Sequence, residues 1–501
     1  MILAPRQSAY IQDAIALVAG LALPFAFAPF QWFPIAVISP ALLFLTWRNN
    51  PPWRAFWRGW LYGMGMFGVG VYWLHISIYQ FGGLKLPVAL LLTYLLVAYL
   101  ACYPAVAGYV ARRFLSVGEA LWLLAVVPAT WTLVEWLRGW ILTGFPWLNL
   151  GYSQIDAPLA SLAPLVGVYG VSWAVALSAG LLAYAFCGGL RQCAYPLSAI
   201  VLLWAGAFLL GRVSWTEPTG ETVKVALLQG NVAQQMKWLP EERQQTIRLY
   251  QALTKKFWGE DLIIWPEVAI PAFYHSVTPV IESLQSKARL DGTDLLIGIP
   301  VLDPDGARYY NSVVAIGGHA GAYHKQHLVP FGEFMPLGKW LQRLADLLAI
   351  PMSGFSAGPA NQPLLRAAGH HVGVSICYEI IFGEEIIRAL PDADFLVNVS
   401  NDGWFGDSLG PHQHFQMARM RALETGRYVL RATNTGITAV IDAKGEVLAR
   451  SPQFKIHTLV ADIWIYDGWT LYARMGNTPV IVAFFLMLGL AAWLGRHSSA
   501  R

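Results

Sequence analysis

Three short stretches of the sequence carry side chains that together can transfer an acyl group. The stretch D-L-I-I-W-P-E ends in Glu267, S-I-C-Y-E contains Cys377, and Y-H-K-Q-H-L-V-P-F-G-E contains Lys325 and Glu333. A thiol is a weak nucleophile until a base removes its proton, and a partly buried carboxylate can act as that base. A nearby ammonium group can face the oxygen that becomes negative in the tetrahedral intermediate. These residue types therefore indicate covalent acyl transfer through the cysteine.

The reactive residues lie at or near the ends of segments with the composition of β-strands. Short apolar runs occur at 222–229, 261–267, 294–300, 312–317, 371–379, 394–401, 428–436 and 437–449, and helical stretches at 240–256, 277–290, 383–390 and 412–426. This alternation predicts a layered α/β domain, with a hairpin turning at Lys444 and Gly445. Ligand sites in such sheets gather beyond the strand ends, so one pocket can collect the reactive side chains.

The composition divides the chain into an apolar part and an ordinary part. The whole chain is 56% hydrophobic and 13% charged, whereas soluble domains carry about 25% charged residues. Residues 1–212 hold 10 Lys/Arg and 4 Asp/Glu, and residues 213–476 hold 22 and 26. A wholly soluble enzyme, a disordered chain and a collagen-like fibre are excluded. We expect a membrane domain with about seven transmembrane helices (1–212), an extracytoplasmic domain (213–476), and a C-terminal transmembrane helix with a short cytoplasmic tail (477–501).

Eight apolar runs are candidates for membrane spans, because a helix needs about 20 apolar residues to cross the hydrocarbon layer. They lie near 10–28, 33–47, 57–79, 86–111, 119–137, 159–187, 194–211 and 479–495. The first is interpreted as a retained helix, with a cleaved signal peptide as the alternative.

The distribution of Lys and Arg between the loops predicts the orientation of these spans. With both termini in the cytoplasm, nine basic residues lie inside and three outside. The inside group is Arg6, Arg48, Arg54, Arg58, Arg112, Arg113, Arg191, Arg496 and Arg501, and the outside group is Lys85, Arg138 and Arg212. This bias places residues 213–476 outside the cytoplasm.

Cys377 is the candidate nucleophile because it is the lone cysteine of this outer domain. The other three lie in or beside apolar runs, at Cys102, Cys187 and Cys193. A single thiol in an oxidising compartment is either buried and inert or kept for its reactivity. Taken separately, Cys377 is typical of a core residue, Lys325 of a solvated loop and Glu267 of a strand end. Their combination favours the catalytic interpretation.

The motifs around these residues resemble the Glu-Lys-Cys signature of the nitrilase superfamily. These motifs lie between membrane spans and are accompanied by the elements H-L-V-P-F-G-E and N-D-G-W-F. Over nearly its whole length the chain therefore resembles the membrane-bound branch of that superfamily, the apolipoprotein N-acyltransferases. The resemblance implies an α-β-β-α sandwich in which Cys377 is the nucleophile, Glu267 the general base and Lys325 the oxyanion-stabilising residue. It implies supporting roles for Glu333, Tyr378 and Glu379, and substrate-binding or arm positions for Trp238 and Asn311.

The resemblance also implies a reaction in two half-steps, without a metal or a diffusible cofactor. Cys377 takes an acyl chain from a phospholipid, typically the sn-1 chain of phosphatidylethanolamine, as a thioester. The α-amino group of the diacylglyceryl-modified N-terminal cysteine of an apolipoprotein then attacks it and becomes acylated. The expected location is the bacterial inner membrane, with the catalytic domain in the periplasm.

Other functions remain as alternatives at the level of sequence. A membrane-tethered amidase or nitrilase would use water in the second half-step, and a transporter or receptor would only bind a ligand in the outer domain. The spacing of apolar residues over 337–352 predicts an amphipathic helix, which fits either a lid at the membrane surface or packing on the domain's own core.

His324, His327, His412 and His414 could suggest a metal site, and the spacing of His412 and His414 suits a ligand pair. A metal is not expected, because no cysteine or cluster of carboxylates accompanies them. Nucleic acid is not expected either, because Arg419, Arg421, Arg427 and Arg431 alternate with Met, Leu and Glu, which is typical of a solvated helix face or of internal salt bridges.

Overall fold

A computed structural model describes residues 5–114, 117–187, 193–334 and 354–498. The chain divides into two compact units. The first comprises residues 1–75, 86–214 and 475–501, and the second comprises residues 76–85 and 215–474. The segment 76–85, which the composition assigned to the membrane domain, thus packs with the second unit. The expected amphipathic helix at 337–352, and Arg191 and Arg501, lie outside the described residues.

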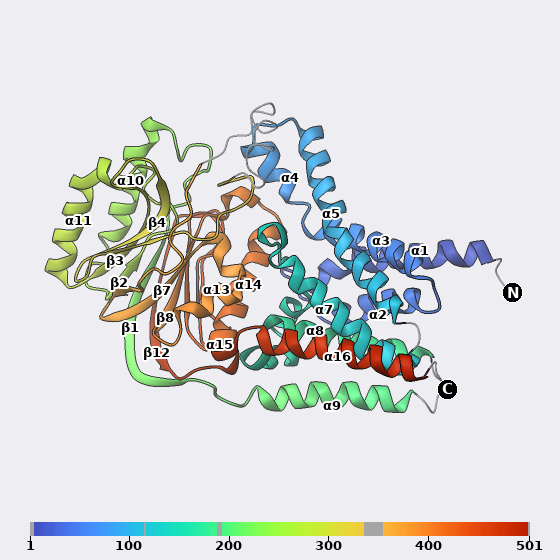
Figure 1. The fold of residues 1–501 in the computed structure, drawn as a ribbon. Helices are drawn as coiled ribbons and strands as arrows, with labels where there is room; N and C mark the ends of the chain where they lie inside the picture. Colours follow the sequence, from blue (N-terminus) through green and yellow to red (C-terminus); the bar gives the residue numbers. More distant parts are fainter. Residues whose placement is uncertain (1–4, 115–116, 188–192, 335–353, 499–501) are drawn as a thin grey trace. The chain divides into compact units, whose positions relative to one another are not determined.

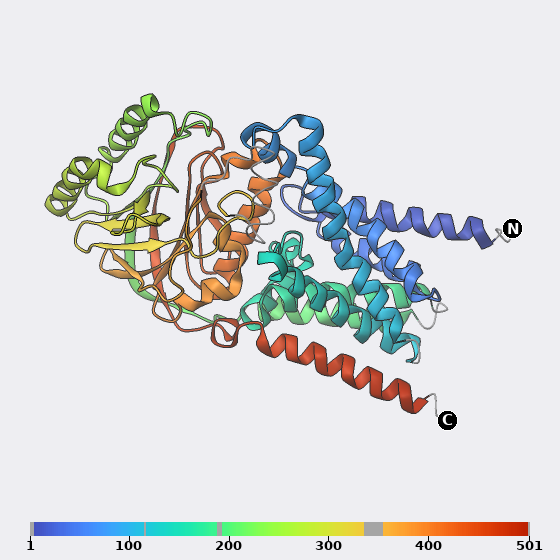
Figure 2. The ribbon, with the colours of Figure 1, turned by 45° about the horizontal axis from the view of Figure 1, so that its top comes forward.

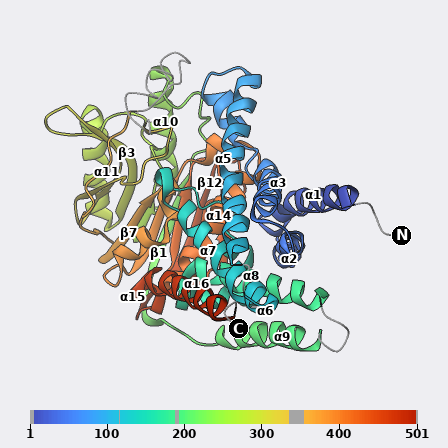
Figure 3. The same cartoon turned by 45° about the vertical axis from the view of Figure 1, so that its right-hand side comes forward.

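The first unit is a bundle of apolar helices. Among the described residues, five helices are long and apolar enough to cross a membrane, a bent pair forms a sixth candidate, and two further apolar helices are shorter. Each of the eight expected runs falls on one of these. Helices α3 and α5 lie side by side (Figure 3). The main helices are α1 (Pro5–Ala22), α2 (Ile35–Trp47), α3 (Pro52–Gly70), α4 (Leu74–Ile76), α5 (Leu86–Arg113), α6 (Glu119–Leu121), α7 (Val127–Arg138), α8 (Ala163–Cys187), α9 (Ala194–Leu210) and α16 (Thr478–Ser498).

Two buried charged residues near the end of α7 hold the segment that follows it. The Arg138 guanidinium donates to the carbonyl oxygens of Phe145 and Trp147 and to Asn149 Oδ1. The Glu135 carboxylate accepts a hydrogen bond from the backbone N–H of Leu150 at 3.0 Å. Both side chains are almost fully buried, so these contacts supply the partners that buried charge requires.

The second unit contains two six-stranded sheets, ordered β12-β1-β2-β3-β4-β5 and β11-β10-β9-β8-β7-β6. In each sheet three parallel strands are flanked by antiparallel ones. The strands are β1 (Glu217–Gln229), β2 (Leu262–Ile264), β3 (Asp294–Leu302), β4 (Tyr309–Ile316), β5 (Gly321–His324), β6 (Leu365–Ala367), β7 (His370–Ile376), β8 (Phe395–Ser400), β9 (Val429–Thr433), β10 (Ala439–Ile441), β11 (Val447–Arg450) and β12 (His457–Asp467).

Successive residues of a strand point to opposite faces of the sheet. A continuous apolar run therefore covers both faces with apolar side chains. In β1, Val225 and Leu227 belong to the core between the two sheets, whereas Ala226 and Leu228 belong to the core under the helices of the first sheet. Continuous apolar runs therefore make central strands, as the sequence predicts.

Helices cover the outer face of each sheet. Helices α10 (Pro240–Thr254) and α11 (Thr278–Asp291) lie outside the first sheet, and α13 (Gly383–Ile386) and α14 (Leu409–Thr425) lie outside the second (Figures 1 and 2). The four-layer α-β-β-α arrangement and the helical membrane domain are thus both confirmed.

Individual elements of this unit agree with the sequence except at the edges of the sheets. The hairpin at Lys444 and Gly445 is present between β10 and β11. Strands β5, β6 and β12 have no counterpart among the predicted runs. They are short or alternate between buried and exposed residues, so their apolar signal is weak.

Candidate active site

Cys377 follows the last residue of β7 and begins a tight helical turn, Cys377–Ile381. Its φ angle is +53°, in the left-handed region that non-glycine residues rarely adopt. The side chain is 8% exposed. Backbone strain of this kind persists only where the surroundings enforce it, and it clusters at functional sites.

Glu267 lies just beyond β2, where W-P-E leaves the sheet. Its Oε1 accepts a hydrogen bond from the side-chain Nδ2 of Asn311, in β4, at 2.7 Å. The residue as a whole is 7% exposed. Asn311 thus fixes the orientation of the proposed base from a neighbouring part of the same sheet.

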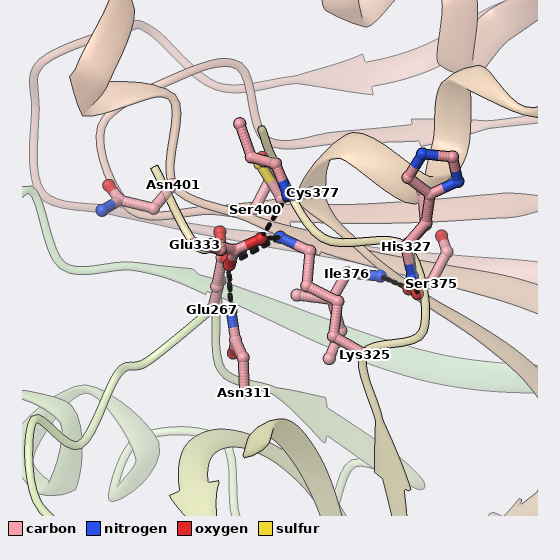
Figure 4. Close-up of polar contacts among 12 residues, drawn as sticks. Glu267, Asn311, Lys325, His327, Glu333, Ser375, Ile376, Cys377, Ser400 and Asn401 are labelled. Atoms are coloured by element: carbon pink, nitrogen blue, oxygen red, sulfur yellow. Dashed lines mark hydrogen bonds and ion pairs between the residues drawn. The ribbon is translucent and has the colours of Figure 1, made fainter. Parts of the chain in front are cut away.

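Lys325 follows β5 directly and points between two carboxylates (Figure 4). Its Nζ lies 2.9 Å from Oε1 and 2.8 Å from Oε2 of Glu333, and 3.7 Å from Oε1 of Glu267. The Nδ2 of Asn311 also lies 3.3 Å from Glu333 Oε1. Four residues that the sequence singled out are therefore brought into one hydrogen-bonded group.

Burial and the charges of this group set the protonation of Cys377. Burial alone would lower the pKa of Lys325, but Glu333 and Glu267 outweigh it and the pKa rises above its usual value. Burial and the negative charge of Glu267 raise the pKa of Cys377 to about 12, against the opposing effect of Lys325. Cys377 is therefore a thiol at neutral pH, and an attack on a carbonyl group requires that its proton be taken up as the sulfur–carbon bond forms.

Glu379 and Tyr378 occupy supporting positions. Glu379 Oε2 accepts from the backbone N–H of Ile376, and its Oε1 accepts from the N–H groups of Gln326 and His327. It ties the end of the nucleophile's strand to the loop after Lys325. The ring of Tyr378 packs edge-on against His327 and Phe382.

Trp238 lies on a segment without regular secondary structure that precedes α10, and half of its surface is exposed. The preceding residue, Lys237, is buried, and its Nζ donates to the carbonyl oxygen of Glu267 at 2.9 Å. Burial lowers the pKa of Lys237 to about 8, although Glu267 and Cys377 oppose this. The arm that carries Trp238 is thus attached to the backbone of the proposed base through a lysine that sequence reasoning missed.

Sequence reasoning also missed a buried polar group behind Cys377. His414 Nε2 lies 3.2 Å from the carbonyl oxygen of Cys377, and Ser400, Asp402 and Arg431 lie beyond it. Part of this group could have been found from the sequence, because the predicted strand at 394–401 ends in polar residues and runs into the N-D-G-W-F element. His414 was considered only as a metal ligand. Among the described residues, no group of three or more His, Cys, Asp and Glu is arranged to hold a metal ion.

The chain matches two known family models. Residues 19–181 match the apolipoprotein N-acyltransferase N-terminal domain, and residues 224–466 match the carbon-nitrogen hydrolase family. It is 47% identical over 468 residues to the apolipoprotein N-acyltransferase of Methylococcus capsulatus, covering 93% of both chains. Identity to the enzyme of that name from Nitrosomonas europaea is 44%, covering 98% of this chain and 99% of the relative. For that of Vibrio cholerae it is 43%, covering 96% of each.

Proposed function

Because the chain belongs to the apolipoprotein N-acyltransferase family, we propose that it acylates apolipoproteins through a thioester on Cys377. The chain is an acyltransferase with a nitrilase-superfamily domain and a membrane domain. The observation that carries the proposed mechanism is the group formed by Glu267, Lys325, Glu333 and Asn311 beside Cys377 (Figure 4).

In the first half-step, the donor is a phospholipid, with the sn-1 chain of phosphatidylethanolamine as the proposed source. The Cys377 sulfur attacks the ester carbonyl carbon while its proton passes to the Glu267 carboxylate. Lys325 and the backbone N–H of Tyr378 face the oxyanion. The intermediate then collapses, the ester C–O bond breaks, and Glu267 returns the proton to the departing lysophospholipid oxygen.

In the second half-step, the acceptor is the free α-amino group of an N-terminal diacylglyceryl-cysteine. The nitrogen attacks the thioester carbonyl carbon, Glu267 takes a proton from it, and the sulfur leaves and is reprotonated. The product is an N-acylated, triacylated lipoprotein. The net charge of the site does not change when the proton moves from Cys377 to Glu267, which suits a buried group that disfavours added charge.

Membrane attachment supports lipid substrates for this site. Acyl chains gain about 0.8 kcal/mol per buried CH₂ in the bilayer, so extracting either substrate into water would be prohibitive. The chain passes from α9 directly into the second unit and returns from it shortly before α16. Both helices are apolar. We propose that it faces the periplasm, as the loop distribution of Lys and Arg indicates.

Intact mass spectrometry tests the first half-step. The full-length protein in detergent is mixed with phosphatidylethanolamine of defined chains and no acceptor. We expect the protein to gain the mass of one acyl chain and hydroxylamine to remove it. Cys102→Ala, which removes a membrane-helix thiol, should show the same gain, whereas Cys377→Ala should show none. An equal gain in Cys377→Ala would contradict the mechanism.

Addition of a diacylated acceptor peptide distinguishes transfer from hydrolysis. N-acylated peptide is the expected product. Free fatty acid with no N-acylated peptide would instead identify a membrane-tethered hydrolase.

A further inference from the structure

A fully buried histidine contacts the backbone of the nucleophile. His414, in α14, has no exposed surface, and its Nε2 lies 3.2 Å from the carbonyl oxygen of Cys377. Because that carbonyl oxygen can only accept a hydrogen bond, the hydrogen must be on Nε2. The side chain is thus a donor to the one backbone oxygen of Cys377.

The opposite edge of the His414 ring is held by a buried ion pair. Nδ1 lies 3.0 Å from both Asp402 Oδ1 and Arg431 Nη2, and Arg431 Nη2 lies 2.8 Å from Asp402 Oδ2. Burial would raise the pKa of Asp402, but the charge of Arg431 opposes it and the pKa is lowered, so the carboxylate stays ionised. Burial and the charge of Arg431 lower the pKa of His414, which favours the neutral ring with Nδ1 as acceptor from Arg431. Arg431, in β9, and the carbonyl oxygen of Cys377 therefore fix the two edges of the ring.

The Asp402 carboxylate is held by two groups. The Ser400 hydroxyl donates to Asp402 Oδ1 at 2.9 Å, and Arg431 Nη2 donates to Asp402 Oδ2. Asp402 thus acts on His414 indirectly, by holding the arginine that donates to His414 Nδ1.

The carbonyl oxygen of Cys377 shares a peptide plane with the N–H of Tyr378. In a trans peptide these two groups point in opposite directions, so fixing the C=O fixes the direction of the N–H. A hydrogen bond to the C=O also polarises the amide and strengthens its N–H as a donor. Without such a restraint, the strained φ of +53° at Cys377 would let the plane relax.

We propose that His414 is a positioning residue that orients the peptide plane between Cys377 and Tyr378, so that the Tyr378 N–H is held toward the oxyanion of the reacting carbonyl. This role rests on the proposed function of Cys377 as nucleophile. Arg431 acts through His414 by donating to Nδ1, which fixes the ring and its tautomer, and Asp402 holds Arg431 in place.

Two substitutions of similar polarity separate this role from general support. His414→Gln places an amide nitrogen where Nε2 was and can still reach the Cys377 oxygen. His414→Asn keeps a polar atom near Asp402 and Arg431 but is too short to reach it. His412→Asn, on the same helix, is the matched control.

Three measurements test the role of His414: acyl-enzyme formation, affinity for a long-chain aldehyde, and the rate of thiol alkylation. The first two depend on the donors that face the oxyanion, and the third does not. Acyl-enzyme formation passes through an oxyanion. A long-chain aldehyde places the oxygen of its hemithioacetal at the same position, because the S–H adds across the aldehyde C=O, so its affinity reports on the same donors. Alkylation by iodoacetamide displaces iodide from an sp³ carbon and forms no oxyanion. We expect His414→Asn to lose roughly 10- to 100-fold in the first two, less than the roughly 100- to 1,000-fold cost of removing an oxyanion donor outright, and to alkylate within about twofold of the native rate.

The control and conservative variants should behave differently from His414→Asn. His414→Gln should recover most of the loss, and His412→Asn should match the native protein in all readouts. Equal losses in acylation and alkylation for His414→Asn, or no loss in either, would overturn the positioning role. If the native protein binds aldehyde no better than Cys377→Ala, the proposed nucleophile itself is wrong, which is a separate outcome.

Discussion

At the scale of single residues, the site is a buried group of carboxylates and ammonium groups. Lys325 lies against Glu333 and within 3.7 Å of Glu267, and Lys237 donates to the carbonyl oxygen of Glu267. Burial and Glu267 together outweigh Lys325, so in this arrangement Cys377 is a thiol rather than a thiolate at rest. This arrangement differs from cysteine sites in which a cation lowers the thiol pKa, and it makes the base essential for each attack by sulfur.

The raised pKa of Cys377 predicts a steep pH dependence of its alkylation. Because burial and Glu267 raise this pKa to about 12, the thiolate fraction grows about tenfold per pH unit throughout the accessible range below it. We expect the iodoacetamide rate, measured by peptide mass spectrometry, to rise from about pH 7 to about pH 9 without levelling off. A plateau near pH 8 would show that Lys325 prevails over burial and Glu267.

At the scale of elements, strand ends deliver the functional side chains and strand interiors hold them in place. β7 ends immediately before Cys377, β2 shortly before Glu267, and β5 immediately before Lys325. Because these strands belong to two different sheets, the packing between the sheets sets the geometry of the site. The core between them is formed by apolar side chains from both.

Removing a side chain from the core between the sheets should therefore destabilise the second unit. Leu430, in β9, has no exposed surface, and Leu→Ala changes at such positions cost about 2–5 kcal/mol because a cavity remains. Leu448→Ala, in β11, is the control, since that leucine is 52% exposed. Thermal unfolding of the full chain in detergent, followed by tryptophan fluorescence, should show Tm lowered by several degrees for Leu430→Ala. Equal Tm values for the two variants would contradict the assignment of this core.

At the scale of the whole molecule, a helical membrane domain and a two-sheet domain are joined at several points of the chain. Besides the connections near residues 214 and 475, the segment 76–85 packs with the second unit. Within that unit, Ser77 Oγ donates to the carbonyl oxygen of Trp404 at 2.7 Å, and Phe81 packs edge-on against the Trp404 ring. The loop that contains N-D-G-W-F is thus supported by a part of the chain that is distant in sequence.

The proposed orientation can be tested by cysteine accessibility in intact cells. Lys444→Cys places a thiol at the exposed β10–β11 turn, and His497→Cys places one at the exposed end of α16. We expect a membrane-impermeant maleimide to label Lys444→Cys in intact spheroplasts, and His497→Cys only after permeabilisation. The native protein controls for its own cysteines. The reverse pattern would place the second unit in the cytoplasm.

The sequence alone determined the division into apolar and ordinary parts, the central strands, and the residues capable of acyl transfer. These follow from local properties, since hydrophobic runs, strand composition and reactive side chains are readable without knowing what they contact. The edge strands β5, β6 and β12 were not predicted, because edge positions weaken the apolar pattern by which strands are recognised.

Only the tertiary structure decided which polar residues surround the nucleophile and how they are charged. Asn311 and Glu267 are separated by 44 residues, and His414 and Cys377 by 37, yet each pair is hydrogen-bonded. Such contacts depend on how the sheets and α14 pack, and the protonation of Cys377 depends on burial. Neither burial nor the distance between charges is a property of a single stretch of sequence, which is why the buried group around His414 was visible only in the folded chain.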